Sequence, residues 1–242
     1  MRGENLTLAG TGTIVNVLTI LIGSFAGLLV GNRLPERINQ ITMQAMGAVT
    51  LYLGFTMALS ANSGPRVITV LICLVVGSWI GEWLDLEGRL DRLGRWLEAR
   101  FGRSGGFTRA FVTASLLFCV GPMAILGSIQ DGLSRNPSIL YTKATLDGIA
   151  SAAFTAALGP GAAFSALPVL VYQGTITLLA GAARQVMTTP VVDGLNAVGG
   201  LLIICLAFNI WQMARFRVAN MLPGLLIIVP AVFLMGRFGF AF

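Results

Sequence analysis

The sequence has no histidine and a single lysine, and charged residues make up only 11% of its 242 positions. Soluble domains carry roughly 25% charged residues, so this chain has too few charges to cover a globule of its size in water. The lack of histidine excludes His-based acid–base catalysis, His metal ligation and a His pH switch. The apolar content of 55% in turn excludes disorder.

Cysteine is also scarce. Cys73, Cys119 and Cys205 each lie inside an apolar run and follow no CxxC spacing, so we interpret them as small buried hydrophobic residues. The sequence contains no HExxH, Walker A or GxGxxG motif. We therefore expect no enzymatic activity, no metal site and no cofactor.

The sequence is rich instead in long apolar runs. A bilayer core about 30 Å thick needs about 20 apolar residues per helix. Division at the charged and Gly/Pro-rich breaks predicts eight spans, with no residues left for a soluble domain. These spans are Gly12–Val30, Ile38–Leu59, Val67–Trp83, Phe107–Ile129, Ala144–Leu158, Ala162–Ala180, Val192–Met213 and Val218–Met235. The prediction is an all-α polytopic membrane bundle, with residues 1–242 as one integral membrane domain.

Residues 84–103, between the third and fourth spans, predict an amphipathic helix. Leucine and phenylalanine recur there at helical spacing, whereas most of the arginines fall on other faces. Such a helix lies in the lipid headgroup layer, with Trp96 as an interfacial anchor. A helix that binds a partner protein is the alternative.

The net charge of +6 comes from arginines in the gaps between apolar runs, which indicates membrane orientation and not nucleic-acid binding. Ten basic residues follow the first, third and seventh spans, against six elsewhere. The ten basic residues that we predict to face the cytoplasm are Arg33, Arg37, Arg89, Arg92, Arg95, Arg100, Arg103, Arg109, Arg215 and Arg217. Both termini would then face outward. If residues 144–180 formed one bent helix, the number of spans would be odd, and the two termini would lie on opposite sides of the membrane.

Two pairs of segments suggest an internal repeat. LLVGNR at 28–33 is similar to LLAGAAR at 178–184, and AMGAVTLYLGF at 45–55 is similar to AVGGLLIICLAF at 197–208. Spans one to three would match spans six to eight in opposite orientation, a common transporter plan. The domain then divides into repeats at 1–83 and 162–242, an interfacial segment at 84–106 and central helices at 107–160. Coincidence among Gly-, Leu- and Ala-rich helices is the alternative.

The most informative polar residues lie within the apolar runs, because an unpaired polar group in hydrocarbon is costly. Pro122 removes a backbone N–H and breaks its helix, so Gly121, Pro122 and Met123 predict a discontinuous helix at a solute or ion site. Ser128, Gln130 and Asp131 follow within three turns. A proline kink that only helps packing is the alternative.

A second polar pattern recurs every four residues, at Lys143, Asp147, Ser151 and Thr155. On a helix these residues form one stripe, which must face protein or water. Lys143 and Asp147 can pair within the helix, and a purely structural ion pair is the alternative. Weaker intramembrane candidates are Asn16, Tyr172, Gln173, Asp193, Asn196 and Asn209.

Several motifs resemble the YdfK/YqgA-like family of bacterial inner-membrane proteins of unknown function. They are RLPERI at 33–38, the Gly81-Glu82 step, the LFC…G…DG(L/M)…PSIL…K…LD pattern from 117 to 147, and VANMLPGLLIIVPA at 218–231. The resemblance runs nearly end to end and implies an all-helical, multi-pass protein of the plasma membrane. Some members carry small residues in place of Pro122, so a shared mechanism does not require this proline.

We expect a transporter or channel for a small solute or ion, with a polar site near the membrane midplane. A non-transporting membrane scaffold is the alternative. The expected partners are the lipid bilayer and the unknown solute, and Gly-rich helix faces could support a homo-oligomer. The predicted binding residues are Asn16, Gly121, Pro122, Met123, Ser128, Gln130, Asp131, Lys143, Asp147 and Ser151.

Overall fold

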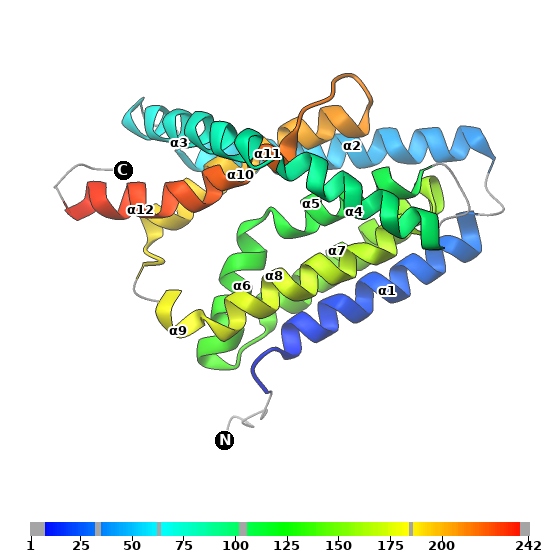
Figure 1. The fold of residues 1–242 in the computed structure, drawn as a ribbon. Coiled ribbons are helices and arrows are strands. Elements are labelled where there is room, and N and C mark those ends of the chain that lie inside the picture. Colours follow the sequence, from blue (N-terminus) through cyan, green and yellow to red (C-terminus); the bar gives the residue numbers. More distant parts are fainter. Residues whose placement is uncertain (1–7, 32–34, 62–63, 102–105, 184–185, 238–242) are drawn as a thin grey trace.

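The computed structural model describes residues 8–31, 35–61, 64–101, 106–183 and 186–237, and these residues form helices and connections without a strand (Figure 1). Arg2, Arg33, Arg103 and Arg184 of the charge pattern lie outside the described residues. The elements are α1 (Thr11–Gly31), α2 (Glu36–Ala58), η1 (Leu59–Ala61), α3 (Gly64–Trp83), α4 (Leu86–Phe101), α5 (Phe107–Cys119), α6 (Pro122–Ser134), α7 (Ser138–Leu158), η2 (Pro160–Ser165), α8 (Ala166–Leu178), α9 (Ala180–Ala183), α10 (Thr189–Ile210), α11 (Val218–Met221) and α12 (Pro223–Arg237). The all-α membrane bundle is confirmed.

Six described stretches are long and apolar enough to cross a membrane. They are Thr11–Gly31, Glu36–Ala58, Arg66–Trp83, Pro160–Leu178, Thr189–Ile210 and Val218–Gly236. Helices α5 and α6, bent by 58° at their break, make a seventh if they form one span. The remaining predicted span lies in α7, where polar side chains lower the mean hydropathy. The count of eight therefore stays a prediction.

Several predicted boundaries shift in the structure. The fifth span, expected to be short, belongs to the 21-residue helix α7. The sixth begins as a 3₁₀ helix after the Gly159-Pro160-Gly161 turn and becomes α-helical at Ala166. The amphipathic segment is helical over 86–101. None of these shifts changes the order of the predicted elements.

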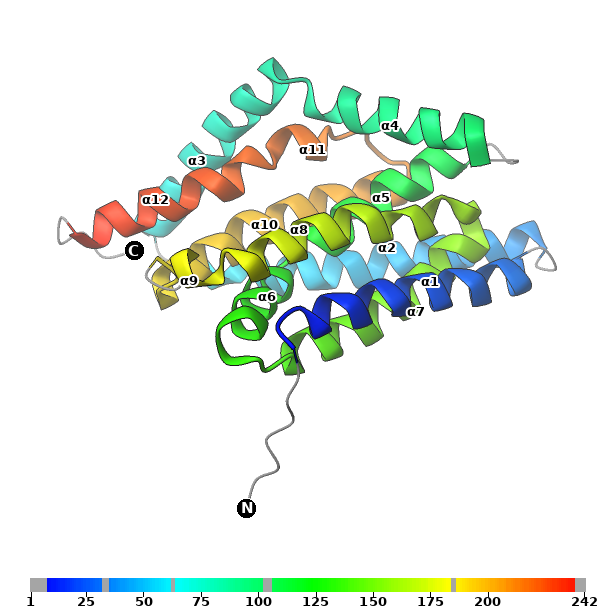
Figure 2. The same ribbon diagram turned by 60° about the horizontal axis from the view of Figure 1, so that its bottom comes forward.

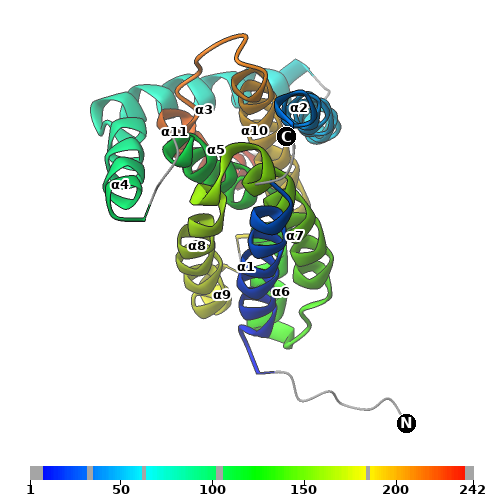
Figure 3. The same cartoon turned by 90° about the vertical axis from the view of Figure 1, so that its right-hand side faces the viewer.

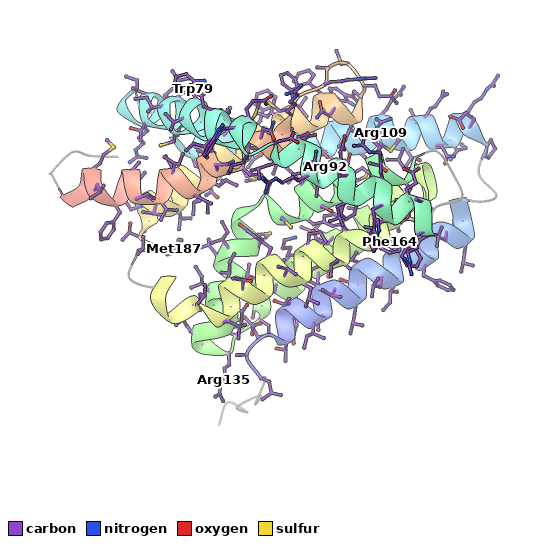
Figure 4. The ribbon with its side chains drawn as sticks, in the orientation of Figure 1. Trp79, Arg92, Arg109, Arg135, Phe164 and Met187 are labelled. Atoms are coloured by element: carbon purple, nitrogen blue, oxygen red, sulfur yellow. The ribbon has the colours of Figure 1, made fainter. Side chains whose placement is uncertain are left out.

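Helix ends collect at two ends of the bundle (Figures 1 and 2). One end holds the C-terminal ends of α1, α7 and α10, the N-terminal ends of α2 and α5, and helix α4. We call it the Arg-rich end, because Arg37, Arg89, Arg92, Arg95, Arg100, Arg109, Arg215 and Arg217 belong to these elements or to the connection after α10. Arg109 and Arg135 lie toward opposite ends in Figure 4.

Viewed from one end, the helices form two groups (Figure 3). Helices α1, α6, α7 and α8 make one group, whereas α2, α3, α10 and α12 make the other. Helix α5 lies between the groups and contacts α7, α8 and α10, and α4 covers its outer side. The polar residues predicted for the site come from the first group and from the α5–α6 break.

Small residues hold α1 and α7 together. A Cβ atom at Gly23 would collide with the carbonyl oxygen of Gly148, and one at Gly27 with that of Ala152. The residue numbers of the contacting positions increase together on α1 and α7, so the two helices run in parallel. Their small residues let the backbones approach closely, as in membrane helix pairs.

Helices that would be equivalent in the predicted repeat are in contact with one another. Helix α1 lies against α8, α2 against α10, and α3 against α12. The members of each pair run in opposite directions (Figure 1). This arrangement agrees with an inverted repeat, which stays a prediction.

Candidate functional site: a buried polar cluster between four helices

The center of the cluster is an ion pair within α7. Lys143 Nζ donates a hydrogen bond to Asp147 Oδ2, and both residues are buried, with 5% and 6% of their surfaces exposed. The opposite face of α7 carries exposed apolar residues, among them Leu146 and Ile149. The polar stripe therefore faces protein and not lipid, as predicted from its four-residue spacing.

Two neighboring helices contribute amides to the network around this pair. Asn16 of α1 donates through Nδ2 to Asp147 Oδ2 at 3.0 Å and to Gln173 Oε1 of α8 at 3.3 Å. Asn16 and Gln173 are both fully buried. Because Asp147 accepts bonds from two helices, its carboxylate joins α1 to α7, and Asn16 extends the network to α8.

The break between α5 and α6 lies beside the same pair. Lys143 Nζ lies 5.8 Å from the center of the Phe118 ring, a geometry in which the ring face attracts the ammonium group. Phe118 is the penultimate residue of α5, and the chain turns at Val120 and Gly121 before α6 begins. The discontinuous helix and the charged stripe therefore meet, as the sequence predicts.

Asp131 binds the start of α1. Its Oδ2 accepts backbone N–H groups from Gly10 at 3.1 Å and Gly12 at 3.0 Å. A carboxylate satisfies unpaired N–H groups at a helix N-terminus and is favored by the helix dipole. Gly12 precedes Asn16 by one turn, so Asp131 and Asp147 bind α1 about 6 Å apart along its axis.

The stripe continues along α7 toward the Arg-rich end. Ser151 Oγ donates to Ile20 O at 2.7 Å and lies 2.8 Å from Ser24 Oγ. Thr155, one turn further, is buried and its hydroxyl has no partner among the described atoms. Ser151 therefore closes α7 against α1, whereas Thr155 leaves a polar group unpaired.

Other polar atoms of the same helix group are buried and unpaired within the described chain. On the amides these are Asn16 Oδ1 and Gln173 Nε2, and on α6 they are Ser128 Oγ, Gln130 Oε1 and Asp131 Oδ1. Buried polar atoms normally have hydrogen-bond partners. Their concentration in the α1–α6–α7–α8 group marks it as the most polar part of the interior.

The structure separates some predicted residues from this cluster. Met123 is 39% exposed, so its side chain lies at the surface of the protein. Gly121 precedes α6, Pro122 is its first residue, and the Pro122 side chain lies outside the described part. Gln173 enters the cluster although the sequence made it only a weak candidate. Its one signal was an amide inside an apolar run.

Two pockets lie at the Arg-rich end, away from the ion pair. One, of about 510 Å³, is lined by the C-terminal end of α7 and by α2, α5 and α10. The other, of about 570 Å³, lies between α4, α5 and the connection after α10. Arg109 lines both pockets, and its Nη2 donates to the carbonyls of Asn209 at 3.3 Å and Ile210 at 2.8 Å. No cluster of three metal-binding side chains occurs in the described ranges.

The apolar helices and the buried polar cluster define a multi-pass α-helical membrane protein. The chain belongs to the family described as "Protein of unknown function (DUF554)", whose model matches residues 11–233. It is 32% identical over 234 residues to the uncharacterized membrane protein YdfK of Bacillus subtilis strain 168, covering 96% of this chain and 99% of YdfK. It is 28% identical over 225 residues to the uncharacterized protein YqgA of Escherichia coli K12, covering 90% and 94%. No solved structure matches this chain.

These similarities confirm the family predicted from the motifs. Together with the apolar helices, they also place the protein in the membrane as a multi-pass protein. The relatives' names assign no substrate, so the functional argument rests on the residues of this chain.

Proposed function

We propose that this protein transports a small solute or ion across the bilayer, with Asp147 and its partners as the central binding site. The main observation that supports this proposal is a buried network across three helices. It joins Lys143, Asp147, Asn16 and Gln173. Ionizable residues inside a membrane are costly and are typical of solute and ion pathways. The proposal includes no enzymatic step and no cofactor.

The position of the pair supports a midplane site. Asp147 is the tenth of 21 residues in α7, so about 14 Å of helix precedes it and about 16 Å follows it. The unpaired Asn16 oxygen and Gln173 nitrogen offer one acceptor and one donor beside the carboxylate. A polar solute or hydrated ion can bind all three groups.

The stripe on α7 supplies a path from this site toward the Arg-rich end. Thr155 lies one turn before Leu158, which lines the pocket of about 510 Å³. Between Asp147 and Thr155, the contact of Ser151 with Ser24 and Ile20 closes the path. A closed contact with a pocket on one side favors a transporter that alternates between conformations over a permanently open channel.

Flux into vesicles containing the purified protein tests the proposal. Pyranine reports proton entry under an imposed potential, and light scattering reports swelling in glycerol, urea and glycine. We expect wild-type protein to accelerate at least one of these fluxes above empty vesicles and Asp147→Asn to abolish the acceleration. Asp193→Asn, at the start of α10 and outside the cluster, is the matched control and should retain flux.

A double variant separates transport from a scaffold role. Removing one partner of a buried ion pair leaves an uncompensated charge, whereas replacing both by apolar residues is often tolerated. Lys143→Met combined with Asp147→Leu should therefore fold and yet lose flux. The transport proposal is wrong if no probe enters faster than into empty vesicles, or if the folded double variant transports like wild type. The first outcome would favor the membrane scaffold.

A further inference from the structure

The pocket of about 570 Å³ has an unusual distribution of charge. Three acidic residues of α4, Glu87, Asp91 and Glu98, line it together with residues of α5 and the connection after α10. At 3.6 residues per turn these three fall within about 40° of one another around the helix. They therefore form one acidic face of α4, and this face turns inward toward the pocket.

The arginines of α4 take the other faces. Arg89, Arg92, Arg95 and Arg100 are all exposed, whereas the three pocket acids are partly buried. Arg92 of α4 is labeled in Figure 4. This separation differs from the expectation for a simple interfacial helix, whose polar face carries basic residues toward lipid headgroups. Membrane attachment therefore does not explain why these acidic residues face inward.

The carboxylates retain binding capacity. Glu87 Oε2 accepts the N–H of Ala219 at 2.8 Å, and Glu98 Oε2 accepts the Thr108 hydroxyl at 2.5 Å. Their Oε1 atoms make no such bond, and Asp91 has no hydrogen bond or ion pair with any described residue. Burial, and to a smaller extent the nearby Asp91 charge, raises the pKa of Glu87 above its usual range.

A second observation points to a ligand. Thr113 of α5 lines the same pocket and is 7% exposed. Its hydroxyl forms no hydrogen bond within the described ranges, so it is available to a molecule in the pocket. The pocket volume lies within the range of small-molecule sites. The pocket thus combines acidic oxygens with the hydroxyl of a largely buried threonine, and this hydroxyl has no partner among the described residues.

The spacing of the acids distinguishes between kinds of cation. Glu87 and Glu98 are eleven residues apart, about 16 Å along the helix axis, and no described cluster is compact enough for a metal ion. A single point charge cannot contact all three carboxylates. A linear chain carrying several ammonium groups can, with Val112 and Phe216 beside its methylene groups.

We propose that this pocket binds a linear polyamine, whose ammonium groups pair with Glu87, Asp91 and Glu98 and hydrogen-bond to Thr113. Arg109 and Arg215 also line the pocket. Arg109 is directed to the carbonyls that end α10, and Arg215 is exposed. Three carboxylates therefore line the pocket against two guanidinium groups. The proposal does not depend on transport through the Asp147 cluster.

Calorimetric titration of the full-length protein in detergent tests the proposal, with spermidine as the probe. We expect saturable binding that n-butylamine and Mg²⁺, at matched ionic strength, do not reproduce. Asp91→Asn should weaken spermidine binding at least about tenfold, because it removes a charge-assisted contact. Thr113→Val, which keeps the side-chain shape, should weaken it severalfold.

Asp85→Asn is the matched control. It changes the net charge by the same amount just before α4, but Asp85 is exposed, pairs with Arg92 and does not line the pocket. This variant should bind spermidine like wild type. Equal effects of Asp85→Asn and Asp91→Asn would overturn the proposal, as would n-butylamine or Mg²⁺ binding as tightly as spermidine. Unchanged circular dichroism and melting of each variant show that the fold is retained.

Discussion

The two buried carboxylates beside α1 have partners of different kinds. Asp147 binds a side-chain cation and an amide, and both can move away when a solute or proton takes their place. Asp131 binds two backbone N–H groups of one helix end, which are fixed by the fold. At the scale of single residues, Asp147 is therefore the candidate for binding and Asp131 the candidate for holding α1.

This difference makes a prediction for Asp131. Asp131→Ala leaves the N–H groups of Gly10 and Gly12 without an acceptor and should cost about 1–2 kcal/mol of unfolding free energy. Asp131→Asn keeps an acceptor oxygen but loses the charge at the helix end, so its cost should be smaller. Denaturant titration followed by circular dichroism measures both. Equal stability of Asp131→Ala and wild type would show that Asp131 does not cap α1.

The sequence predicts part of this site and misses the rest for a physical reason. The Lys143–Asp147 pair follows from a separation of four residues on one helix. The bond from Asn16 to Gln173 joins residues 157 positions apart, and only the packing of α1 against α8 brings them together. Met123 points outward because the turn at Gly121 sets the rotation of α6, which a motif around a proline does not reveal.

At the scale of elements, the contact between α1 and α7 determines where the polar stripe lies. Gly23, Gly27 and Gly31 lie against Gly148, Ala152 and Ala156, at spacings of four residues on both helices. The same spacing places Asp147 next to Asn16 and Ser151 next to Ile20. Close packing by small residues and the alignment of the polar groups therefore depend on each other.

Substitution of Gly23 tests this interface. In Gly23→Ala the new methyl group would collide with the Gly148 carbonyl oxygen, so we expect a loss of about 1–3 kcal/mol. Gly174→Ala is the control, because a Cβ at Gly174 meets no atom within 4 Å. There alanine should stabilize the helix by up to about 1 kcal/mol. The interface assignment fails if both variants melt alike.

Element boundaries show what apolar patterns predict well. The predicted first span, Gly12–Val30, and α1 differ by one residue at each end, because no charged residue interrupts this helix. Helix α7 begins six residues before its predicted start, since Tyr141, Thr142 and Lys143 interrupt the apolar run without ending the helix. Hydropathy therefore underestimates the length of a helix that carries buried charged groups, such as Lys143 and Asp147 of α7.

At the scale of the whole molecule, α7 decides the topology. It runs parallel to α1 along matched positions from Gly12 against Leu140 to Gly31 against Ala156. If α1 crosses the bilayer, a helix that lies beside it over this length crosses as well. With α5 and α6 counted as one span, we then expect eight crossings, and we predict that the Arg-rich end with both pockets faces the cytoplasm.

Single cysteines at exposed positions test this topology, after Cys73, Cys119 and Cys205 are replaced by alanine. With eight crossings, a membrane-impermeant maleimide should label Asn136→Cys and Thr188→Cys in intact cells. Arg89→Cys and Met213→Cys should be labeled only after the membrane is opened. If α7 does not cross, every later segment changes side, so Thr188→Cys becomes protected and Met213→Cys accessible, while Asn136→Cys and Arg89→Cys are unchanged. That result would remove Asp147 from the membrane interior and with it the midplane site, because a surface ion pair requires no transport pathway.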